Sequence, residues 1–378
     1  MLTDTAILGP GGSERFLRNL VSRLPARAYR VQVLQLSPEP APGQRVAAPL
    51  GVPGVEVASQ PVEAVYGAAG RAAYWAVRRR VAAGEFDIVQ SQHEKSDFIN
   101  ALLPRGPAGL LRISCRRDMG FQKTPRVRRA FRHLNARFDH IIAPTPAILQ
   151  GLQQDENGCA ERMSCIPNGV ETDRFAPLEA AARARLRAEL GYGPEHLLIG
   201  CVASLSPIKR HADLIDGFAV LAALHPAARL LLVGEGPLRG ELEAQIAALR
   251  LGASVRLLGA RSGMEGLLPA FDVFTLASSS EGLSNAIIEA QACGLPVVAT
   301  AVGGNVDLVR PGHNGLLVPA LAPGELGRAL LQAAADADWR AQAGQHAREQ
   351  ALAQHSMAAM VEAYDRVYRR LLAERGGV

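Results

Sequence analysis

The sequence predicts an α/β protein made of two domains, each built around a parallel β-sheet. Its 378 residues exceed the size at which a single hydrophobic core usually stops growing, so two domains are expected. In the second half, short apolar runs alternate with helical patterns, and this βαβ repetition implies a parallel sheet. The predicted strands of that half are 197–203, 229–233, 255–258, 273–276, 297–300 and 316–318.

The composition is that of a globular protein, with 48% hydrophobic and 20% charged residues. There is no run of 18 apolar residues, so no transmembrane helix is predicted. The N-terminus lacks a basic segment followed by an apolar one, so we expect no secretory signal. The five cysteines form no C-x-x-C pair and no spaced Cys/His set. We therefore expect a reduced, cytoplasmic chain without structural zinc.

In the first half of the chain, predicted strands and helices alternate less regularly. Residues 1–8 hold only a short first strand, and the glycine-rich segment 9–14 follows it. Glycines between a strand and a helix allow a ligand phosphate to approach the backbone, although an ordinary tight turn gives the same pattern. The other elements expected here are a helix ended by Pro25, strands at 31–36, 86–90, 110–114 and 140–145, a Pro/Gly-rich loop at 37–53, and helices at 63–83 and 125–138.

Basic residues concentrate between residues 112 and 137, where nine Lys and Arg accompany a single acid, Asp118. A solvated helix face explains such a run as well as attraction to an anionic membrane surface or to a phosphate-bearing acceptor does. Nucleic acid is not expected, because no aromatic platform or helix-turn-helix pattern accompanies the charge. The basic residues are Arg112, Arg116, Arg117, Lys123, Arg126, Arg128, Arg129, Arg132 and Arg137.

The most informative stretch is 281–304. Ser284 or Asn285 is a suitable N-cap, a helix follows to residue 292, and Gly294 with Pro296 ends it before a buried strand. The free amides at 282–285 would attract an anion, and Glu281 lies beside them. A phosphate site next to a carboxylate suits a nucleotide sugar. By spacing alone, however, Glu281 and Glu289 also fit a capped helix with a solvated glutamate.

This stretch closely resembles the donor-site signature of the family 4 retaining glycosyltransferases, enzymes of the two-domain GT-B fold. Residues 166–175 resemble the family's interdomain crossing, and residues 203–210 and 312–319 resemble two of its loops. The resemblance implies two Rossmann-like, doubly wound domains facing across a cleft. Residues 1–169 would bind the acceptor, with helix 357–378 packing back on them, and residues 170–356 would bind the nucleotide-sugar donor.

The resemblance also assigns roles to residues. His93, Lys209 and Glu281 would be catalytic, although a lone histidine such as His93 is often a bystander. Ser204 stands where the family often has an arginine, and Arg210 is a candidate to replace that phosphate contact. No cofactor and no metal is implied. The implied donor-binding residues are Gly11, Gly12, Ser204, Lys209, Arg210, Gly234, Arg261, Glu281, Gly282, Leu283, Ser284, Asn285 and Glu289, and the implied acceptor-binding residues are Asp97, Arg116 and Arg117.

The implied activity is retaining transfer of a sugar from a nucleotide-diphosphate sugar, with UDP the first expectation. The acceptor would be a glycan or a lipid-linked sugar of the cell envelope, an exopolysaccharide or lipopolysaccharide. The enzyme would be cytoplasmic, or peripheral on the inner face of the membrane. Two alternatives stay open: a nucleotide-sugar epimerase or phosphorylase on the same fold, and a non-catalytic subunit that binds sugar.

Overall fold

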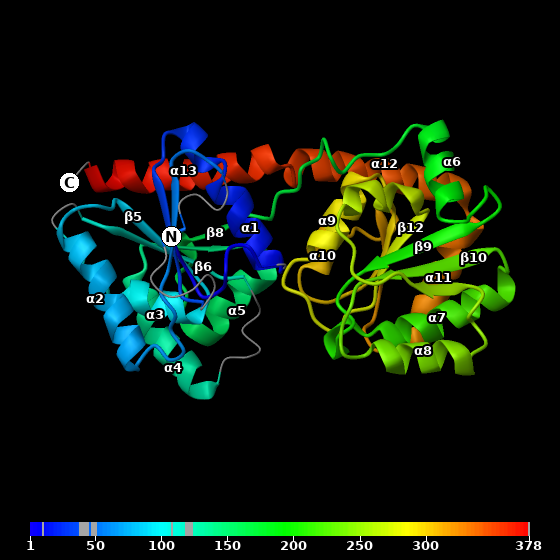
Figure 1. Ribbon diagram of the computed structural model, residues 1–378, viewed down its shortest axis with the longest axis horizontal. Coiled ribbons are helices and arrows are strands. Elements are labelled where there is room, and N and C mark those ends of the chain that lie inside the picture. The colour runs from blue at the N-terminus through cyan, green and yellow to red at the C-terminus, as the bar shows by residue number, and fades with distance from the viewer. Residues whose placement is uncertain (10, 38–44, 47–50, 107–108, 118–123, 377–378) are drawn as a thin grey trace. The chain divides into compact units, whose positions relative to one another are not determined.

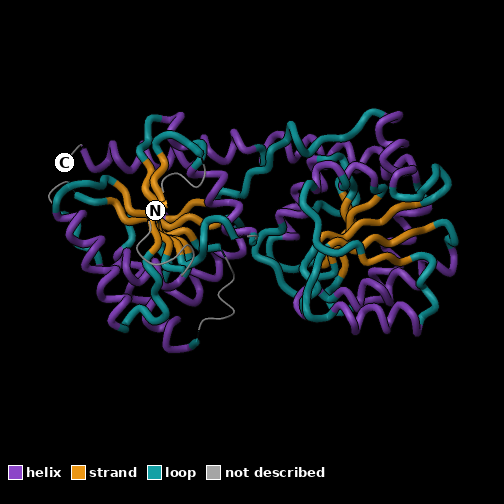
Figure 2. The backbone as a smooth tube through the Cα atoms, in the orientation of Figure 1, coloured by secondary structure: helices purple, strands orange, loops and turns teal. Residues whose placement is uncertain are grey.

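The computed structural model describes residues 1–9, 11–37, 45–46, 51–106, 109–117 and 124–376. The chain forms two compact units, each with its own sheet and helices (Figures 1 and 2). The first unit comprises Met1–Gly169 and Met357–Val378, and the second comprises Val170–Ser356. These are the residue ranges that the sequence predicts for the two domains.

The first unit contains an eight-stranded sheet in the order β3-β4-β2-β1-β5-β6-β7-β8. All neighbouring strands are parallel except β3 and β4, which are antiparallel. The strand β3 lies inside the segment 37–53, which the sequence predicts to be a loop. The strands are β1 (Leu2–Thr3), β2 (Val31–Gln35), β3 (Arg45–Val46), β4 (Val55–Ser59), β5 (Ile88–Gln92), β6 (Leu111–Cys115), β7 (His140–Ala143) and β8 (Met163–Cys165).

Helices cover both faces of this sheet, because side chains alternate along each strand. Val31 and Val33 of β2 join the core that contains α1 and α13, whereas Leu34 packs against the core of α2 and α3. The predicted helix 63–83 is shorter, since α2 begins at Ala68. The helices are α1 (Gly12–Val21), α2 (Ala68–Ala82), α3 (Glu94–Leu102), α4 (Pro125–Leu134), α5 (Pro146–Glu156) and α13 (Met357–Gly376), with short 3-10 turns η1 (Leu24–Arg27), η2 (Asn135–Arg137) and η3 (Ala160–Arg162).

The C-terminal helix α13 belongs to the first unit, as the resemblance implies. Met360, Tyr364 and Tyr368 are buried against the sheet. At the far end, Arg375 contacts Asp87 at 3.1 Å. No helix among the described residues is both long enough and apolar enough to cross a membrane.

The second unit contains a six-stranded parallel sheet in the order β11-β10-β9-β12-β13-β14. In chain order this is 3-2-1-4-5-6, the arrangement of doubly wound dinucleotide-binding folds, and its switch point lies between β9 and β12. The strands are β9 (Leu197–Val202), β10 (Ala228–Val233), β11 (Val255–Leu257), β12 (Val273–Leu276), β13 (Val297–Thr300) and β14 (Gly315–Val318). Each lies within about one residue of its predicted range.

The helices of the second unit alternate with its strands and enclose a core of aliphatic and aromatic side chains. Ligands bind in such folds at the carboxyl ends of the strands, where loops on either side of the switch point diverge. The helices are α6 (Ala180–Glu189), α7 (His211–Leu224), α8 (Arg239–Ala248), α9 (Asn285–Ala292), α10 (Asn305–Leu308), α11 (Pro323–Ala335) and α12 (Ala337–Gln354), with 3-10 turns η4 (Pro207–Lys209), η5 (Met264–Gly266) and η6 (Leu268–Ala270).

Candidate functional site

The switch point of the second sheet brings two predicted residues together. Lys209 ends the short turn η4 after β9, and Glu281 lies in the loop after β12. The Lys209 Nζ donates to the Glu281 Oε1 at 2.5 Å. The same oxygen accepts a hydrogen bond from the Ser278 hydroxyl at 2.6 Å. Lys209 and Glu281 expose 22% and 9% of their side chains, so the pair is largely shielded from water yet reachable.

Backbone contacts hold these two loops in register. Ser279 N–H donates to the Ile208 carbonyl at 2.8 Å, which ties the loop after β12 to η4. On the other side, Gly303 has a φ of +47°, and a Cβ there would lie 1.7 Å from the Glu281 carbonyl oxygen. Gly304 N–H donates to the Gly282 carbonyl at 3.0 Å. The loop that carries Glu281 is therefore clamped between the turns after β9 and β13.

The helix α9 begins directly behind this pair. Ser284 is its N-cap, because the Ser284 hydroxyl accepts the Ile287 amide at 3.3 Å. The prediction of a capped helix is thus confirmed, with Ser284 rather than Asn285 as the cap. Glu289 lies about one turn into α9 and is buried, with 5% of its surface exposed. Gly282, Leu283 and Asn285 are half-buried at the start of the helix.

The remaining predicted donor residues of this unit differ in their surroundings. Gly234 has a φ of +149°, and a Cβ there would lie 1.9 Å from the Ala203 carbonyl oxygen, so the loops after β9 and β10 touch at this glycine. Ser204 and Arg261 are exposed. Arg210 donates two hydrogen bonds to Asp213, at 2.7 and 2.8 Å, and these raise the pKa of Arg210. In this arrangement the Arg210 fork is occupied by Asp213.

Two buried groups lie behind the Lys209–Glu281 pair. Burial, reinforced by the neighbouring Lys209, lowers the pKa of His211 to about 4. Burial raises the pKa of the Cys201 thiol to about 12. The first is therefore a neutral imidazole and the second a neutral thiol at physiological pH. Lys209 is the nearby cation that contributes to both pKa shifts. Neither buried group supplies a nucleophile.

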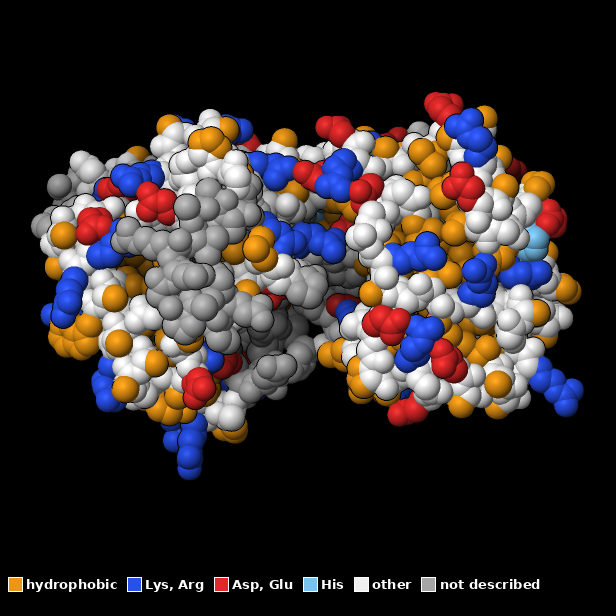
Figure 3. Space-filling model, viewed as in Figure 1, with side chains coloured by type: hydrophobic (Ala, Val, Ile, Leu, Met, Phe, Trp, Pro, Cys, Tyr) orange, Lys and Arg blue, Asp and Glu red, His pale blue; other side chains and the backbone are white. Residues whose placement is uncertain are grey.

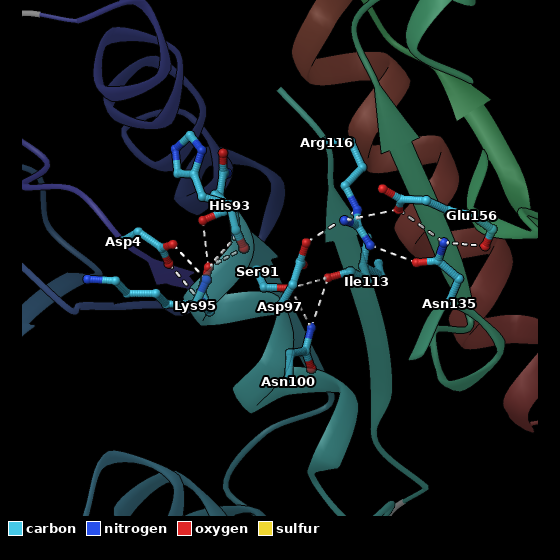
Figure 4. Close-up of polar contacts among 12 residues, drawn as sticks. Asp4, Ser91, His93, Lys95, Asp97, Asn100, Ile113, Arg116, Asn135 and Glu156 are labelled. Atoms are coloured by element: carbon cyan, nitrogen blue, oxygen red, sulfur yellow. Dashed lines mark hydrogen bonds and ion pairs between the residues drawn. The ribbon is translucent and has the colours of Figure 1, made fainter. Parts of the chain in front are cut away.

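In the first unit, His93 and Gly11 lie at the carboxyl edge of the sheet. His93 follows β5 with a φ of +80°, an uncommon backbone conformation for a residue with a side chain, and such conformations cluster at functional sites. Gly11 is the extended N-cap of α1, and Gly12 is the first residue of that helix. Sequence reasoning missed Asp4, whose carboxylate accepts the amides of Lys95 and Ser96 at 2.7 Å and so caps α3 beside His93 (Figure 4).

Asp97 and Arg116 lie inside the first unit. Asp97 has no exposed surface and Arg116 exposes 5%. Their side chains face each other at 3.2 Å, and the Ser91 hydroxyl donates to Asp97 at 2.6 Å (Figure 4). Arg116 also contacts Glu156 at 3.7 Å. The buried guanidinium thus joins α3 and α5 to the residue that follows β6, and contact of either residue with an acceptor stays a prediction.

The basic run is revised. Arg112 is buried, and its guanidinium donates to the Leu103 carbonyl at 3.1 Å. Arg117 is half-buried and stacks over the Phe16 ring at 3.7 Å. Lys123 and Asp118 lie outside the described residues. The exposed part of the run is on α4 and η2, where Arg126, Arg129, Arg132 and Arg137 face solvent.

Among the described residues, no group of three or more His, Cys, Asp or Glu side chains is placed to hold a metal ion. The chemically active groups of the second unit are instead one ammonium, one carboxylate and the amides at the start of α9. This set can donate hydrogen bonds to a diphosphate and accept hydrogen bonds from hydroxyl groups.

Comparison with solved structures defines the class of fold. Anabaena HepE, crystallised with UDP, aligns over 98% of both chains with a TM-score of 0.82 and 23% identity. Sucrose-phosphate synthase from Thermosynechococcus elongatus aligns over 99% of both chains with a TM-score of 0.84 and 22% identity. At this level of identity the likeness concerns the fold. The chain has the GT-B fold of two doubly wound units.

Family models then give the family. The model described as Glycosyltransferase Family 4 matches residues 10–174, and the model described as Glycosyl transferases group 1 matches residues 196–336. Together they span most of both units. The chain therefore belongs to the family 4, or group 1, glycosyltransferases.

Curated relatives match over part of their length. A D-inositol 3-phosphate glycosyltransferase from Corynebacterium jeikeium is 36% identical over 244 residues, which are 62% of this chain and 58% of that protein. A GDP-mannose-dependent monoacylated alpha-(1-6)-phosphatidylinositol monomannoside mannosyltransferase from Corynebacterium glutamicum is 28% identical over 254 residues, 65% of this chain and 66% of that protein. The alignments thus span less than two thirds of either relative.

Proposed function

We propose that this protein is a retaining glycosyltransferase that moves a sugar from a nucleotide-diphosphate sugar to a glycan or lipid-linked acceptor. The observation that carries the proposal is the Lys209–Glu281 pair beside the start of α9, at the switch point of the second sheet. An ammonium and helix amides suit a diphosphate, and the carboxylate suits vicinal hydroxyls of a sugar. Both halves of a nucleotide sugar thus have a partner within one loop cluster.

The mechanism follows from where charge develops. When the bond from the anomeric carbon to the diphosphate breaks, negative charge collects on the leaving phosphate oxygens. The α9 amides are already held in place, and Lys209 would join them once its ion pair with Glu281 opens, so that both stabilise this charge. Glu281 would release Lys209 to the phosphates and turn to sugar hydroxyls. We assign the retained configuration to attack on the same face that the diphosphate leaves. His93 and the Gly11–Gly12 loop keep their predicted roles in catalysis and donor binding.

The donor is proposed to be a UDP-sugar. HepE was crystallised with UDP and with UDP-glucose, whereas the Corynebacterium glutamicum relative is named for GDP-mannose. A thermal-shift panel of UDP-glucose, GDP-mannose and ADP-glucose separates these options, because a bound ligand raises unfolding temperature in proportion to its occupancy. We expect the largest shift with UDP-glucose. A larger shift with GDP-mannose would overturn the UDP assignment, and no shift with any donor would count against the proposed function.

Incubation without acceptor tests the alternatives. An epimerase would convert the sugar of the nucleotide sugar, whereas a transferase would leave the sugar unchanged and release nucleotide slowly. A non-catalytic subunit would bind the nucleotide sugar and do neither. Analysis of UDP and of the recovered sugar after incubation with UDP-glucose distinguishes the three.

We also propose that the acceptor belongs to a cell-envelope product. The enzyme would lie on the inner face of the membrane as a peripheral protein. On the face shown in Figure 3, basic side chains occur as separate groups among acidic ones on each unit. The helix α4 supports the membrane assignment, since it exposes Arg126, Arg129 and Arg132 and has no acidic residue in its first turn. Attraction of such a helix to anionic lipid is screened by salt.

Cosedimentation with vesicles of phosphatidylglycerol and phosphatidylcholine tests this part. We expect binding at low salt that fades as salt rises. It should weaken in a variant with Arg129→Glu and Arg132→Glu, and should not weaken with the matched change Arg71→Glu and Arg79→Glu on α2. Absence of binding at low salt would leave α4 as an ordinary solvated face.

A further inference from the structure

The side chain of Arg117 contacts three segments that are far apart in the sequence. Its guanidinium lies over the Phe16 ring at 3.7 Å and donates a hydrogen bond to the Asn168 side-chain oxygen. The Tyr364 hydroxyl interacts electrostatically with the same side chain, which opposes the lowering of the Arg117 pKa by burial. Phe16 lies on α1, Asn168 on the chain leaving the first unit, and Tyr364 on α13, which returns to it. All four residues belong to the first unit.

The two connections between the units are fastened close to this point. Asn168 precedes Gly169, the last residue before the chain enters the second unit, and Tyr364 is two turns into the helix that begins at Met357. The Gly169 amide donates to the Met360 sulfur at 3.2 Å, so the departing and returning segments also touch each other. Inside the second unit, the Val170 amide donates to the His355 carbonyl at 2.8 Å. The two connections therefore run side by side.

The helix α1 adds a link to the glycine-rich loop. Phe16 lies one turn after Gly12, where α1 begins, and both Phe16 and Tyr364 are buried in the same core with ring centroids 5.7 Å apart. The Arg117 guanidinium also lies over the Phe16 ring. A displacement of the guanidinium would therefore change the contacts at the start of α1 and at both connections.

Chemistry favours arginine at this place. A planar, delocalised guanidinium can stack on an aromatic ring and donate hydrogen bonds in its own plane at the same time, which an ammonium cannot. Burial lowers the pKa of Arg117, and the neighbouring Tyr364 and Cys115 oppose that shift. A charge taken out of water in this way is costly unless its donors are used, so the contacts are mutually dependent.

We propose that Arg117 is a positioning residue that fastens both interunit connections to α1 and hence to the Gly11–Gly12 loop. Its consequence for catalysis rests on the proposed function, whereas its consequence for the connections does not. The same guanidinium would fix the direction in which the chain leaves and re-enters the first unit, and the start of the helix behind the proposed phosphate loop.

Hydrogen exchange followed by mass spectrometry on the full chain tests the structural part. In an Arg117→Met variant, peptides covering 166–170 and 357–364 should exchange at least tenfold faster, and peptides covering β5 and β7 should keep their rates. Arg117→Lys retains the charge and a donor but not the planar stacking, so its effect should be intermediate. The control is Arg79→Met, which removes an exposed arginine from α2.

The kinetic readout is UDP release from UDP-glucose. We expect kcat to fall at least tenfold in Arg117→Met and less in Arg117→Lys. Unchanged exchange at both connections would overturn the proposal, and if kcat still fell, a direct substrate contact would be the explanation. Exchange that rises evenly across the first unit would also overturn it, because that signals general loosening. If the wild-type protein releases no UDP, the proposed function fails, and the exchange data alone decide the role of Arg117.

A second variant reaches the same contacts without touching the arginine. Asn168→Ala combined with Tyr364→Phe removes the side-chain oxygen that accepts from Arg117 and the hydroxyl beside the guanidinium, and keeps the ring at position 364. We expect the same two peptides to exchange faster. Wild-type rates in this variant would overturn the proposal even if Arg117→Met fails to fold.

Discussion

At the scale of single residues, the pairing of Lys209 with Glu281 makes a prediction that neither residue makes alone. Because Lys209 is held in place before any ligand arrives, its contribution should appear in the transition state for loss of the diphosphate. Replacing Lys209 with Ala should lower kcat/KM for UDP-glucose. The expected loss of transition-state stabilisation is about 2–4 kcal/mol, the scale of one preorganised electrostatic group. Nucleotide release provides the measurement, and Arg328→Ala, an exposed change in the same unit, is the control. Wild-type activity in Lys209→Ala would remove this lysine from the site.

Glu281 and Glu289 should differ in the part of the nucleotide sugar that each one binds. Glu281 is in the loop ahead of α9, whereas Glu289 is about one turn into that helix and buried. We expect Glu289→Gln to weaken binding of UDP and of UDP-glucose together, because it would hold the ribose. Glu281→Gln should spare UDP, since Lys209 remains available to the phosphates, and should reduce transfer. Calorimetric titration of each variant with UDP and with UDP-glucose makes the comparison. Equal loss of UDP affinity in both variants would show that the division of roles is wrong.

Sequence reasoning reached the residues of the second unit more surely than those of the first. Lys209, Glu281 and Ser284 lie in short loops whose positions follow from regular βαβ units, so their proximity could be expected. Sequence reasoning missed Ser278, Asp4 and His211. Nothing local in the sequence shows that a hydroxyl, a carboxylate or an imidazole faces a distant loop. The burial of Asp97 and Arg116 was missed for the same reason, because only tertiary packing shows that a charged residue has a buried partner.

At the scale of elements, Gly303 decides where the Glu281 loop lies. An Ala at this position would bring its Cβ to 1.7 Å from the Glu281 carbonyl oxygen, at a φ of +47°. Gly312 provides a matched control, because it also has a positive φ, +77°, but a Cβ there meets nothing within 4 Å. Both substitutions carry the backbone strain of about 1–2 kcal/mol, and only Gly303→Ala adds a clash.

We therefore expect Gly303→Ala to lose more stability than Gly312→Ala, and to weaken binding of UDP-glucose as well. Denaturant unfolding measures the first effect and calorimetry the second. If the two variants lose the same stability and bind UDP-glucose equally, the close approach at Gly303 does not position the loop.

Strands with a regular apolar pattern were predicted more accurately than strands without one. In the second unit the buried strands are short, continuous apolar runs, and each lies within about one residue of its predicted bounds. In the first unit β1 has two residues and is held by pairing with both β2 and β5, a tertiary effect that its own sequence does not specify. The strand β3 is likewise held by antiparallel pairing with β4, inside a segment whose prolines and glycines indicate a loop.

At the scale of the whole molecule, each unit encloses its own core and its own buried histidine. His140, on β7 of the first unit, is 1% exposed, and its Nε2 lies 2.8 Å from the Ser164 hydroxyl. His211, at the start of α7 in the second unit, is also 1% exposed. Burial lowers the pKa of both to about 4, with Arg370 adding to the shift of His140 and Lys209 to that of His211. Neither imidazole is charged in the folded protein near neutral pH.

The sign of the resulting pH dependence follows from proton binding. In the unfolded chain each histidine takes up its proton near pH 6.5, but in the folded chain only near pH 4. Between these values the unfolded state binds more protons, so acid favours unfolding, and the loss levels off below about pH 4. At pH 5 each histidine should cost its unit about 2 kcal/mol relative to pH 7.5. His140→Gln should therefore reduce the acid sensitivity of the first unit, and His211→Gln that of the second. Denaturant unfolding at both pH values, with the exposed change His133→Gln as control, measures this difference. If each variant loses as much stability as the wild type on acidification, the buried histidines are not the source of the pH dependence.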